Sequence, residues 1–380
     1  MARRDAPLPG VTAVVPAYNM EAFLERTLTS AIRQTYPELD IVVIDDGSTD
    51  RTREVAERVA ATHDRIRVES VANAGVAAAR NLGTRLARTP YVAYLDADDL
   101  WHPEKIARQV AALAAHGHEG EWAASYALTR YIGIADEVLG NGPSVEARGP
   151  FFEKHLYRNH VGNGSALLVR RDAALALGGF DQSHAARGIG GLEDYDFQLR
   201  LLSRYRLELV REFLVGYRIR PGQMSDDADR MSRARPVIIE AVLADCPLSQ
   251  KQRRQALAHA RIVAAWHRLL AGHPFSAAAD LARAIRQSPG AVSSWLPEMV
   301  KAKLAHRAAA RKQPWAASAA ARRFEELDPL EEVAPHDGGA AGAIKPRAAF
   351  EAMRARSAPA LRSAEAPASE SVADRSARAG

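Results

Sequence analysis

The sequence lacks the features that define a secreted, disulfide-linked or membrane-spanning protein. Its 380 residues include one cysteine, Cys246, which excludes an intrachain disulfide and any site built from several thiolates. No window reaches the roughly 18 uncharged apolar residues of a membrane span. The first apolar run is interrupted at Pro16, too early for a signal peptide. We therefore expect a cytoplasmic protein.

A strong excess of one charge is also missing. The formal net charge is +5, too small and too dispersed to argue for a nucleic-acid partner. The second half is rich in arginine, so peripheral association with the inner face of an acidic membrane stays open. With 47% hydrophobic and 26% charged residues, the composition is that of a globular protein.

What the sequence does contain, from residue 11 to about 113, is a regular alternation of strands and helices. Apolar strands such as "VTAVVPAY" and "LDIVVID" alternate with amphipathic helices such as "MEAFLERTLTSAIRQ". This alternation predicts parallel strands joined by right-handed crossovers. Because ligands of such sheets lie outside the carboxyl ends of the strands, we expect the loops that follow the strands to meet in one cleft.

The rest of the chain divides by composition. Mixed strands and helices continue to about residue 225, and an Ala-, Leu- and Arg-rich helical region that could bind a protein partner follows over 226–312. We expect residues 1–9 to be a short tail and residues 313–380 a largely disordered one, because large apolar side chains are sparse there.

Three carboxylates, those of Asp96, Asp98 and Asp99, follow the predicted strand "YVAYL". Asp99 could cap the next helix, but a cap does not explain Asp96. Packed carboxylates repel one another unless a cation binds them, and oxygen ligands of this kind suit Mg2+ or Mn2+. An Asp-x-Asp pair is common, so the pattern alone does not establish a metal site.

A second polar loop follows the strand "VVID". Its Asp45, Asp46, Gly47 and Ser48 are ordinary turn residues. Paired with the end of the first strand, however, they would bring Tyr18 for stacking and a carboxylate for an N–H group together. That combination suits a nucleobase.

Taken in order, "VVPAYN", "VVIDDGSTD", "NAGVAAARNLG", "YLDADD", "WHPEK", "GGFD" and "GLEDYDFQLRL" resemble the family 2 glycosyltransferases. The resemblance covers residues 10–225. It implies an α/β GT-A fold, with a mixed, mainly parallel sheet and flanking helices, to which a C-terminal helical region is added. It also implies a nucleotide-sugar donor and a divalent metal. The donor is expected to be a UDP-sugar, and guanine and thymine donors stay open. Transfer to a hydroxyl of a glycan, lipid-linked or other acceptor is expected to invert the anomeric carbon.

The resemblance implies roles for individual residues. Asp98 and Asp96 match the metal-binding pair, and Asp194 in "GLEDYDF" matches the general base, with Glu193 and Trp101 expected at the acceptor. For Trp101 a role in the core stays an open alternative. The donor-nucleotide positions are Pro16, Ala17, Tyr18, Asp45, Asp46, Arg80 and Asp96. A helix N-terminus at Asp194 would favour its ionised form, which keeps it available as a base but makes it a weaker one.

One segment departs from the family pattern. Many members end this domain with a Tyr-Arg-x-His segment, whereas this chain reads "YRIRPGQMS", with Arg220 in place of the histidine. A guanidinium cannot ligate a metal, but it can pair with a phosphate. We therefore expect Arg218 or Arg220 to supply positive charge to the diphosphate.

Other classes remain to be weighed against an enzyme of bacterial polysaccharide or glycoconjugate synthesis. "RGIGGLE" follows no strand, which argues against a dinucleotide site. A sugar-nucleotide nucleotidyltransferase would carry an early glycine-rich, lysine-containing signature, which is not seen near residues 10–30. A non-catalytic nucleotide-sugar binder or assembly scaffold stays open, and donor hydrolysis would distinguish it from the enzyme.

Overall fold

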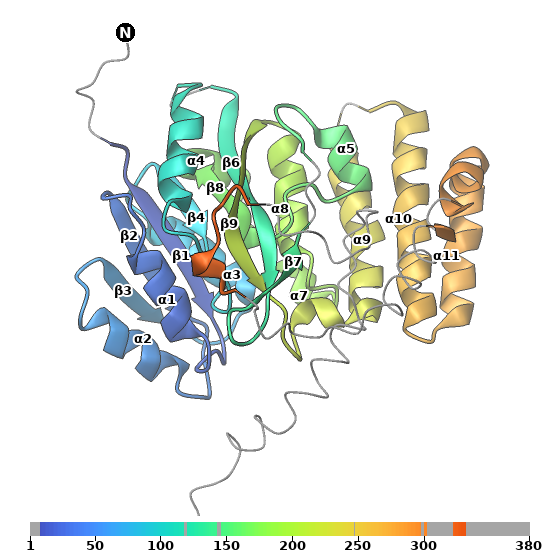
Figure 1. Cartoon of the computed structure of the whole chain (residues 1–380). Helices are drawn as coiled ribbons and strands as arrows, with labels where there is room; N and C mark the ends of the chain where they lie inside the picture. Colours follow the sequence, from blue (N-terminus) through green and yellow to red (C-terminus); the bar gives the residue numbers. More distant parts are fainter. Residues whose placement is uncertain are drawn as a thin grey trace, which may run out of the picture.

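The computed structural model describes residues 8–117, 120–142, 146–246, 248–297, 300–301 and 322–331. Within them the central element is one nine-stranded sheet (Figure 1). Its order is β3-β2-β1-β4-β8-β6-β9-β5, and β7 pairs with β6. The strands are β1 Val11–Ala17, β2 Leu39–Asp45, β3 Ile66–Ser70, β4 Tyr91–Tyr94, β5 Leu100–Trp101, β6 Trp122–Ile132, β7 Val138–Asn141, β8 Leu167–Arg170 and β9 Arg206–Arg218.

The first half of the sheet is parallel, as the alternating pattern predicts. β1 pairs in parallel with β2 and with β4, and β2 pairs in parallel with β3. The connecting helices are α1 Leu24–Ile32, α2 Thr52–Ala60 and α3 Val76–Leu86, and α4 Lys105–Ala114 follows β5. β1 and β4 are buried at every residue because helices cover both faces, which explains their near-continuous apolar runs.

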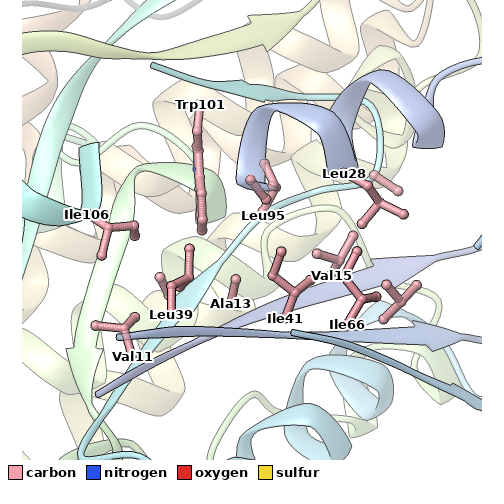
Figure 2. Close-up of a cluster of buried hydrophobic side chains, with 14 of the residues drawn as sticks. Val11, Ala13, Val15, Leu28, Leu39, Ile41, Ile66, Leu95, Trp101 and Ile106 are labelled. Carbon is pink, nitrogen blue, oxygen red and sulfur yellow. The ribbon is translucent and has the colours of Figure 1, made fainter. Parts of the chain in front are cut away.

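Figure 2 shows the core on the α1 side of this half of the sheet, where β1 and β2 meet α1 and α4. Val15, Ile41 and Leu28 are fully or almost fully buried there, and the Trp101 ring packs over the same cluster. This core fixes the strands rigidly, so the loops at their carboxyl ends are anchored on both sides.

Beyond β4 the sheet becomes mixed. β8 is antiparallel to both β4 and β6, while β9 runs parallel to β6 over almost its whole length. Strand β9 is the longest of the sheet, with 13 residues. The mixed sheet with flanking helices agrees with the expected fold class. Short helices complete this part: α5 Phe152–Tyr157, α6 Arg171–Ala176, α7 Ser183–Ala186 and α8 Glu193–Leu202.

The C-terminal helices form a layer at the side of the molecule opposite α1 and α2 (Figure 1). They are α9 Ala228–Ala244, α10 Gln250–Leu270 and α11 Pro274–Gln287, and residues 289–297 are also helical. Ser249 and Gln252 form a capping box that starts α10. No helix of the described residues is both long enough and apolar enough to cross a membrane.

Residues 322–331 lie within the tail expected to be largely disordered, yet they pack on the mixed half of the sheet. The Phe324 side chain is fully buried against Leu100 and Ile132, and Arg130 donates to the carbonyl oxygens of Asp328 and Glu331. Although apolar residues are sparse after residue 313, the segment 322–331 is therefore anchored to the sheet. Residues 313–321 and 332–380, the remainder of that prediction, lie outside the described residues. So do residues 302–312 of the expected helical region and residues 1–7 of the expected N-terminal tail.

Candidate active site

The loops after β1 and β2 are joined at the carboxyl edge of the sheet. Pro16 and Ala17 end the buried strand β1, Asp46 N donates to Ala17 O over 2.9 Å, and Thr49 N donates to Asn19 Oδ1 over 2.8 Å. Tyr18, expected to flank the base, is 43% exposed. An exposed aromatic ring beside a rigid strand end can accept a stacked base.

The two adjacent acids of this loop have different partners. Asp46 accepts from the backbone N–H groups of Ala74 and Gly75, each over 2.8 Å. Asp45 accepts from Ser48 N over 3.2 Å. Asp46 therefore holds the loop that leads into α3, and Gly75 enters that helix with a φ of 89° that favours glycine. A contact between Asp46 and the nucleobase stays a prediction. The Asp45 carboxylate accepts one hydrogen bond, whereas the Asp46 carboxylate accepts two.

Arg80 connects separate parts of the site. It comes from α3, is 5% exposed, and forms an ion pair with Asp96 after β4. Its guanidinium lies over the Phe180 ring at 5.1 Å. Asn81, the next residue, exchanges hydrogen bonds with the backbone of Phe180, and a Cβ on Gly179 would collide with its side chain at 2.2 Å. The "RNLG" and "GGFD" motifs thus pack on each other.

Asp98 is paired with Arg220. The distance from Arg220 Nε to Asp98 Oδ2 is 2.5 Å, and both side chains are mostly buried, at 17% and 16% exposure. One oxygen of Asp96 and one of Asp98 are thus held by guanidinium groups, and each carboxylate has a second oxygen with no hydrogen bond among the described residues.

Asp99 does not cap a helix, because α4 begins only at Lys105. Its buried carboxylate accepts from Ser165 Oγ over 2.6 Å and from Arg218 N over 2.9 Å. Burial raises the pKa of Asp99 well above its usual range, and the charges of Asp98 and Asp96 raise it further. Asp99 therefore connects the loop after β4 to Ser165 and to the end of β9 at Arg218. Sequence reasoning did not assign it this role.

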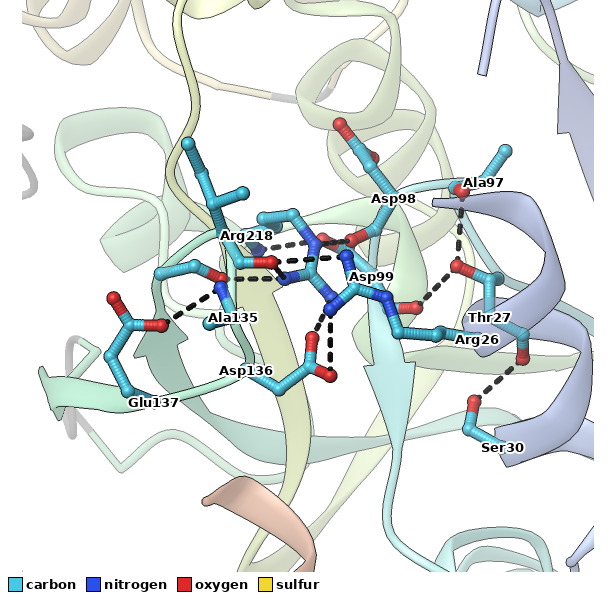
Figure 3. A network of polar contacts seen from close by, with 12 residues as sticks. Arg26, Thr27, Ser30, Ala97, Asp98, Asp99, Ala135, Asp136, Glu137 and Arg218 are labelled. Atoms are coloured by element: carbon cyan, nitrogen blue, oxygen red, sulfur yellow. Dashed lines mark hydrogen bonds and ion pairs between the residues drawn. The ribbon is translucent and has the colours of Figure 1, made fainter. Parts of the chain in front are cut away.

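Arg218 lies beneath this loop rather than in it (Figure 3). It is 1% exposed and donates to the carbonyl oxygens of Asp98 and Gly133, over 2.6 and 2.5 Å. It also forms an ion pair with Asp136 over 2.5 Å. Because these partners occupy the buried Arg218 guanidinium, its position argues against the expected contact with the diphosphate. Arg220 remains the candidate for that contact. Asp136 carried no motif that would have indicated its part in the network.

Asp194 lies in the first turn of α8, close enough to the loop after β4 for their charges to interact. Burial raises its pKa to about 6; Arg80 opposes the rise, whereas Glu193 and Asp96 add to it. The helix N-terminus was expected to favour the ionised form, but desolvation outweighs it. A carboxyl with this pKa is a stronger base than an ordinary aspartate while remaining ionised at neutral pH.

Two residues expected at the acceptor are engaged elsewhere. Both carboxylate oxygens of Glu193 lie 2.9 Å from the N–H of Gly191, so the side chain turns back onto its own loop. Trp101 is 1% exposed, donates from Nε1 to Ser165 O over 3.0 Å, and has the Lys105 amine 3.9 Å from its ring centre. The open alternative for Trp101, a core role, is the one this geometry favours.

The donor set fits a hard divalent cation with few protein ligands. The described residues hold no cluster of three or more His, Cys, Asp or Glu side chains that could bind a metal by themselves. The second oxygens of Asp96 and Asp98 are the ligands that remain. Mg2+ typically takes one or two carboxylates and completes its shell with substrate phosphates and water. The pair therefore fits a cation that binds together with a diphosphate.

Comparison with known proteins agrees with this architecture. Residues 12–136 match the family model "Glycosyl transferase family 2". A glycosyltransferase of Bacillus subtilis, EpsJ, is 42% identical over 92 residues, 24% of this chain and 27% of that protein. The chondroitin synthase of Escherichia coli is 37% identical over 99 residues, 26% of this chain and 14% of that protein. The matches to both relatives thus cover less than a third of their length.

Among solved structures, the mannosyltransferase PcManGT from Pyrobaculum calidifontis, in complex with GDP-Man and Mn2+, has a similar fold. The TM-score is 0.53 with 22% sequence identity, over 79% of this chain and 81% of that one. At this identity the likeness shows the fold alone, and it is the GT-A type of fold expected from the motifs.

Proposed function

From the match of residues 12–136 to the glycosyl transferase family 2 model, we propose the transfer of a sugar from a nucleoside-diphosphate donor to an acceptor hydroxyl, with inversion at the anomeric carbon. The observation that carries the proposal is the convergence of Asp96 and Asp194. They come from segments almost a hundred residues apart, and the charge of each raises the pKa of the buried Arg80 guanidinium.

Asp194 is the proposed general base. An inverting transfer requires the acceptor oxygen to attack the anomeric carbon from the face opposite the leaving diphosphate, and the oxygen must lose its proton as the new bond forms. With a pKa of about 6, Asp194 is ionised at neutral pH and accepts that proton. The bond between the anomeric carbon and the diphosphate breaks as the bond to the acceptor oxygen forms. The electron pair of the broken bond leaves with the nucleoside diphosphate.

Asp98 and Asp96 are the proposed ligands of Mg2+ or Mn2+. When bound, the cation would neutralise charge on the leaving diphosphate by Lewis-acid assistance. The chain's own contribution is positional: Asp99 and Arg218 hold the backbone of the loop from below, through the contacts at Arg218 N and Asp98 O. Arg80 fixes the orientation of Asp96.

Arg220 is the proposed diphosphate ligand. It occupies the position of the family's histidine and cannot itself bind a metal. In the structure it pairs with Asp98. A diphosphate would be a competing partner for this guanidinium, and its arrival would free Asp98 for the cation. Metal and nucleotide should therefore help each other bind.

The donor is proposed to be a UDP-sugar, with Tyr18 stacked on the base and Asp45 or Asp46 accepting from its N–H group. Since PcManGT was solved with GDP-Man, GDP-sugars belong in the same screen. The acceptor is proposed to be a hydroxyl of a growing glycan in bacterial polysaccharide or glycoconjugate synthesis. The name of the related chondroitin synthase supports a glycan product.

Slow hydrolysis of the donor tests the proposal without knowledge of the acceptor. With Mn2+ and the right nucleotide sugar, the protein should release nucleoside diphosphate, and Asp98→Ala should abolish the release. Arg33→Ala, which breaks an exposed ion pair with Glu325, is the matched control and should leave the rate unchanged. Binding without turnover across all donors and acceptors would instead support the alternative, a nucleotide-sugar-binding scaffold.

A further inference from the structure

The outermost helix of the C-terminal layer has an apolar face that nothing in the described residues covers. α11 buries Ala277, Asp280 and Ala284 against its neighbours. Its opposite side shows five exposed apolar residues at helical spacing: Phe275, Ala278, Ala279, Ala282 and Ile285. Phe275 is 91% exposed and Ile285 47%. Leu269, at the end of α10 across the turn, is 53% exposed. We call these six residues the outer face.

The segment that carries the outer face has an excess of positive charge. Residues 248–297 contain seven Lys and Arg residues and a single acid, Asp280. That acid is 2% exposed and forms ion pairs with Arg268 at 2.8 Å, Arg283 at 3.5 Å and Arg261 at 3.8 Å. This stretch therefore presents no carboxylate to solvent. Arg286 lies at the edge of the outer face without an ion-pair partner among the described residues.

The dimensions of the outer face decide between two kinds of occupant. A 14-residue helix is about 21 Å long and about 10 Å wide, which gives about 200 Å². A stable protein–protein interface buries about 800 Å² on each partner. The outer face is therefore small for a protein partner. One bulky aromatic ring, small alanines and flanking arginines instead form the pattern of helices that lie at the boundary between headgroups and acyl chains.

We propose that the outer face docks on an anionic phospholipid surface. Phe275 and Leu269 enter the acyl boundary, and Arg286 lies at the level of the phosphate groups. The rings and side chains that enter the bilayer lose their contact with water, while the guanidinium groups replace counterions at the membrane. The C-terminal layer lies at the side of the molecule away from α1 and α2, so docking there leaves the loops after β1 and β2 uncovered (Figure 1).

Vesicle flotation with the full chain tests this assignment. The protein should float with vesicles that contain phosphatidylglycerol and should remain below with pure phosphatidylcholine. Phe275→Ser should lower the vesicle partition coefficient about tenfold, because most of one aromatic side chain no longer leaves water. Arg286→Glu should lower it at least about fivefold. Phe275→Trp should retain or strengthen binding, since tryptophan is favoured at membrane interfaces.

Matched controls separate docking from general effects. Leu175→Ser changes another exposed leucine, 40% exposed on α6, and Arg65→Glu reverses an exposed charge between α2 and β3; both should float like the native chain. Thermal melts should show that Phe275→Ser folds normally. Absence of flotation with every anionic vesicle, or flotation that Phe275→Ser leaves unchanged, would overturn the assignment. So would a dimer in light scattering that Phe275→Ser dissociates, because the occupant would then be a second copy. None of these measurements depends on glycosyl transfer.

Discussion

Arg220 Nε donates to Asp98 Oδ2 over 2.5 Å, so the carboxylate expected to bind a cation already has a cationic partner. The same guanidinium lies 5.8 Å from the centre of the Phe23 ring and donates to Met20 Sδ over 3.4 Å. These contacts come from the loop before α1, close to the expected nucleotide. Arg220 thus contacts both the expected metal ligand and the nucleotide side of the site.

We expect Arg220→Ala to separate metal binding from nucleotide binding. Without its competing guanidinium, Asp98 should bind Mn2+ about fivefold more tightly in the absence of nucleotide, since a partly buried ion pair is worth about 1 kcal/mol. In the presence of Mn2+, the affinity for UDP should fall instead. Titration calorimetry measures both constants. An unchanged Mn2+ affinity would show that the pair does not restrain Asp98.

Asp194→Asn should remove the proton acceptor while keeping the shape of the site. We expect kcat for sugar transfer to fall by about 100-fold or more, with Mn2+-dependent UDP binding retained. In the native chain, kcat/KM should decline below about pH 6, because the base becomes protonated there. Asp196→Asn is the control on the same helix, where the native side chain pairs with Arg200. A profile that stays flat down to pH 5 would contradict the assignment of Asp194.

The raised pKa of Asp194 also has a consequence for stability. Since its pKa in the folded state lies above the usual value, a stability penalty develops as the pH rises from about 4 to about 6 and is complete above that. Removing the charge should therefore stabilise the fold at pH 8, by about 1 kcal/mol after allowance for solvent screening, but not at pH 4. Denaturant unfolding of Asp194→Asn at the two pH values measures the difference.

Arg218→Met should damage the fold rather than one catalytic step. It removes a buried cation, takes the guanidinium donor from the carbonyl of Asp98 and leaves Asp136 with only the more exposed Arg26, which should cost about 3–5 kcal/mol of stability. Arg26→Met breaks the more exposed ion pair to the same Asp136 and should cost about 1 kcal/mol or less. Chemical denaturation compares the two. Equal, small losses would mean that the buried network contributes little.

Phe324→Ala tests the anchored segment of the tail. Its fully buried ring packs on Leu100 and Ile132, so truncation should destabilise the chain by about 3–5 kcal/mol. Leu330→Ala, at a site 69% exposed in the same segment, should change stability by less than about 0.5 kcal/mol. Were the segment detached in solution, both variants would melt like the native chain.

Sequence reasoning located the elements of the parallel half of the sheet well, because buried strands and amphipathic helices have distinct periods. It also grouped Asp96 and Asp194 through motifs that lie in a fixed order. It could not anticipate Arg218, since a guanidinium that ends β9 can face the cleft or the interior, and only the packing against Asp136 decides which.

Trp101 and Glu193 illustrate the same limit. Each lies beside a motif residue, yet adjacency in sequence does not fix the direction of a side chain. Trp101 turns into the core because Ser165 offers a carbonyl acceptor there, and Glu193 turns back because Gly191 offers an N–H. Phe324 was hidden for another reason, since one or two apolar residues in a polar stretch do not produce a periodic signal.

Because the segment around Phe324 packs back on the sheet, the domain that contains Asp96, Asp98 and Asp194 is built from two separate stretches of the sequence. Val138 N donates to Arg322 O, and Phe213 N donates to Pro329 O, so strands β7 and β9 gain backbone partners that are translated after α11. A fragment expressed only to residue 225 would expose Leu100 and Ile132 to water and leave Arg130 without two backbone acceptors. Swapping the helical layer between related enzymes would therefore require this short downstream piece to be carried along.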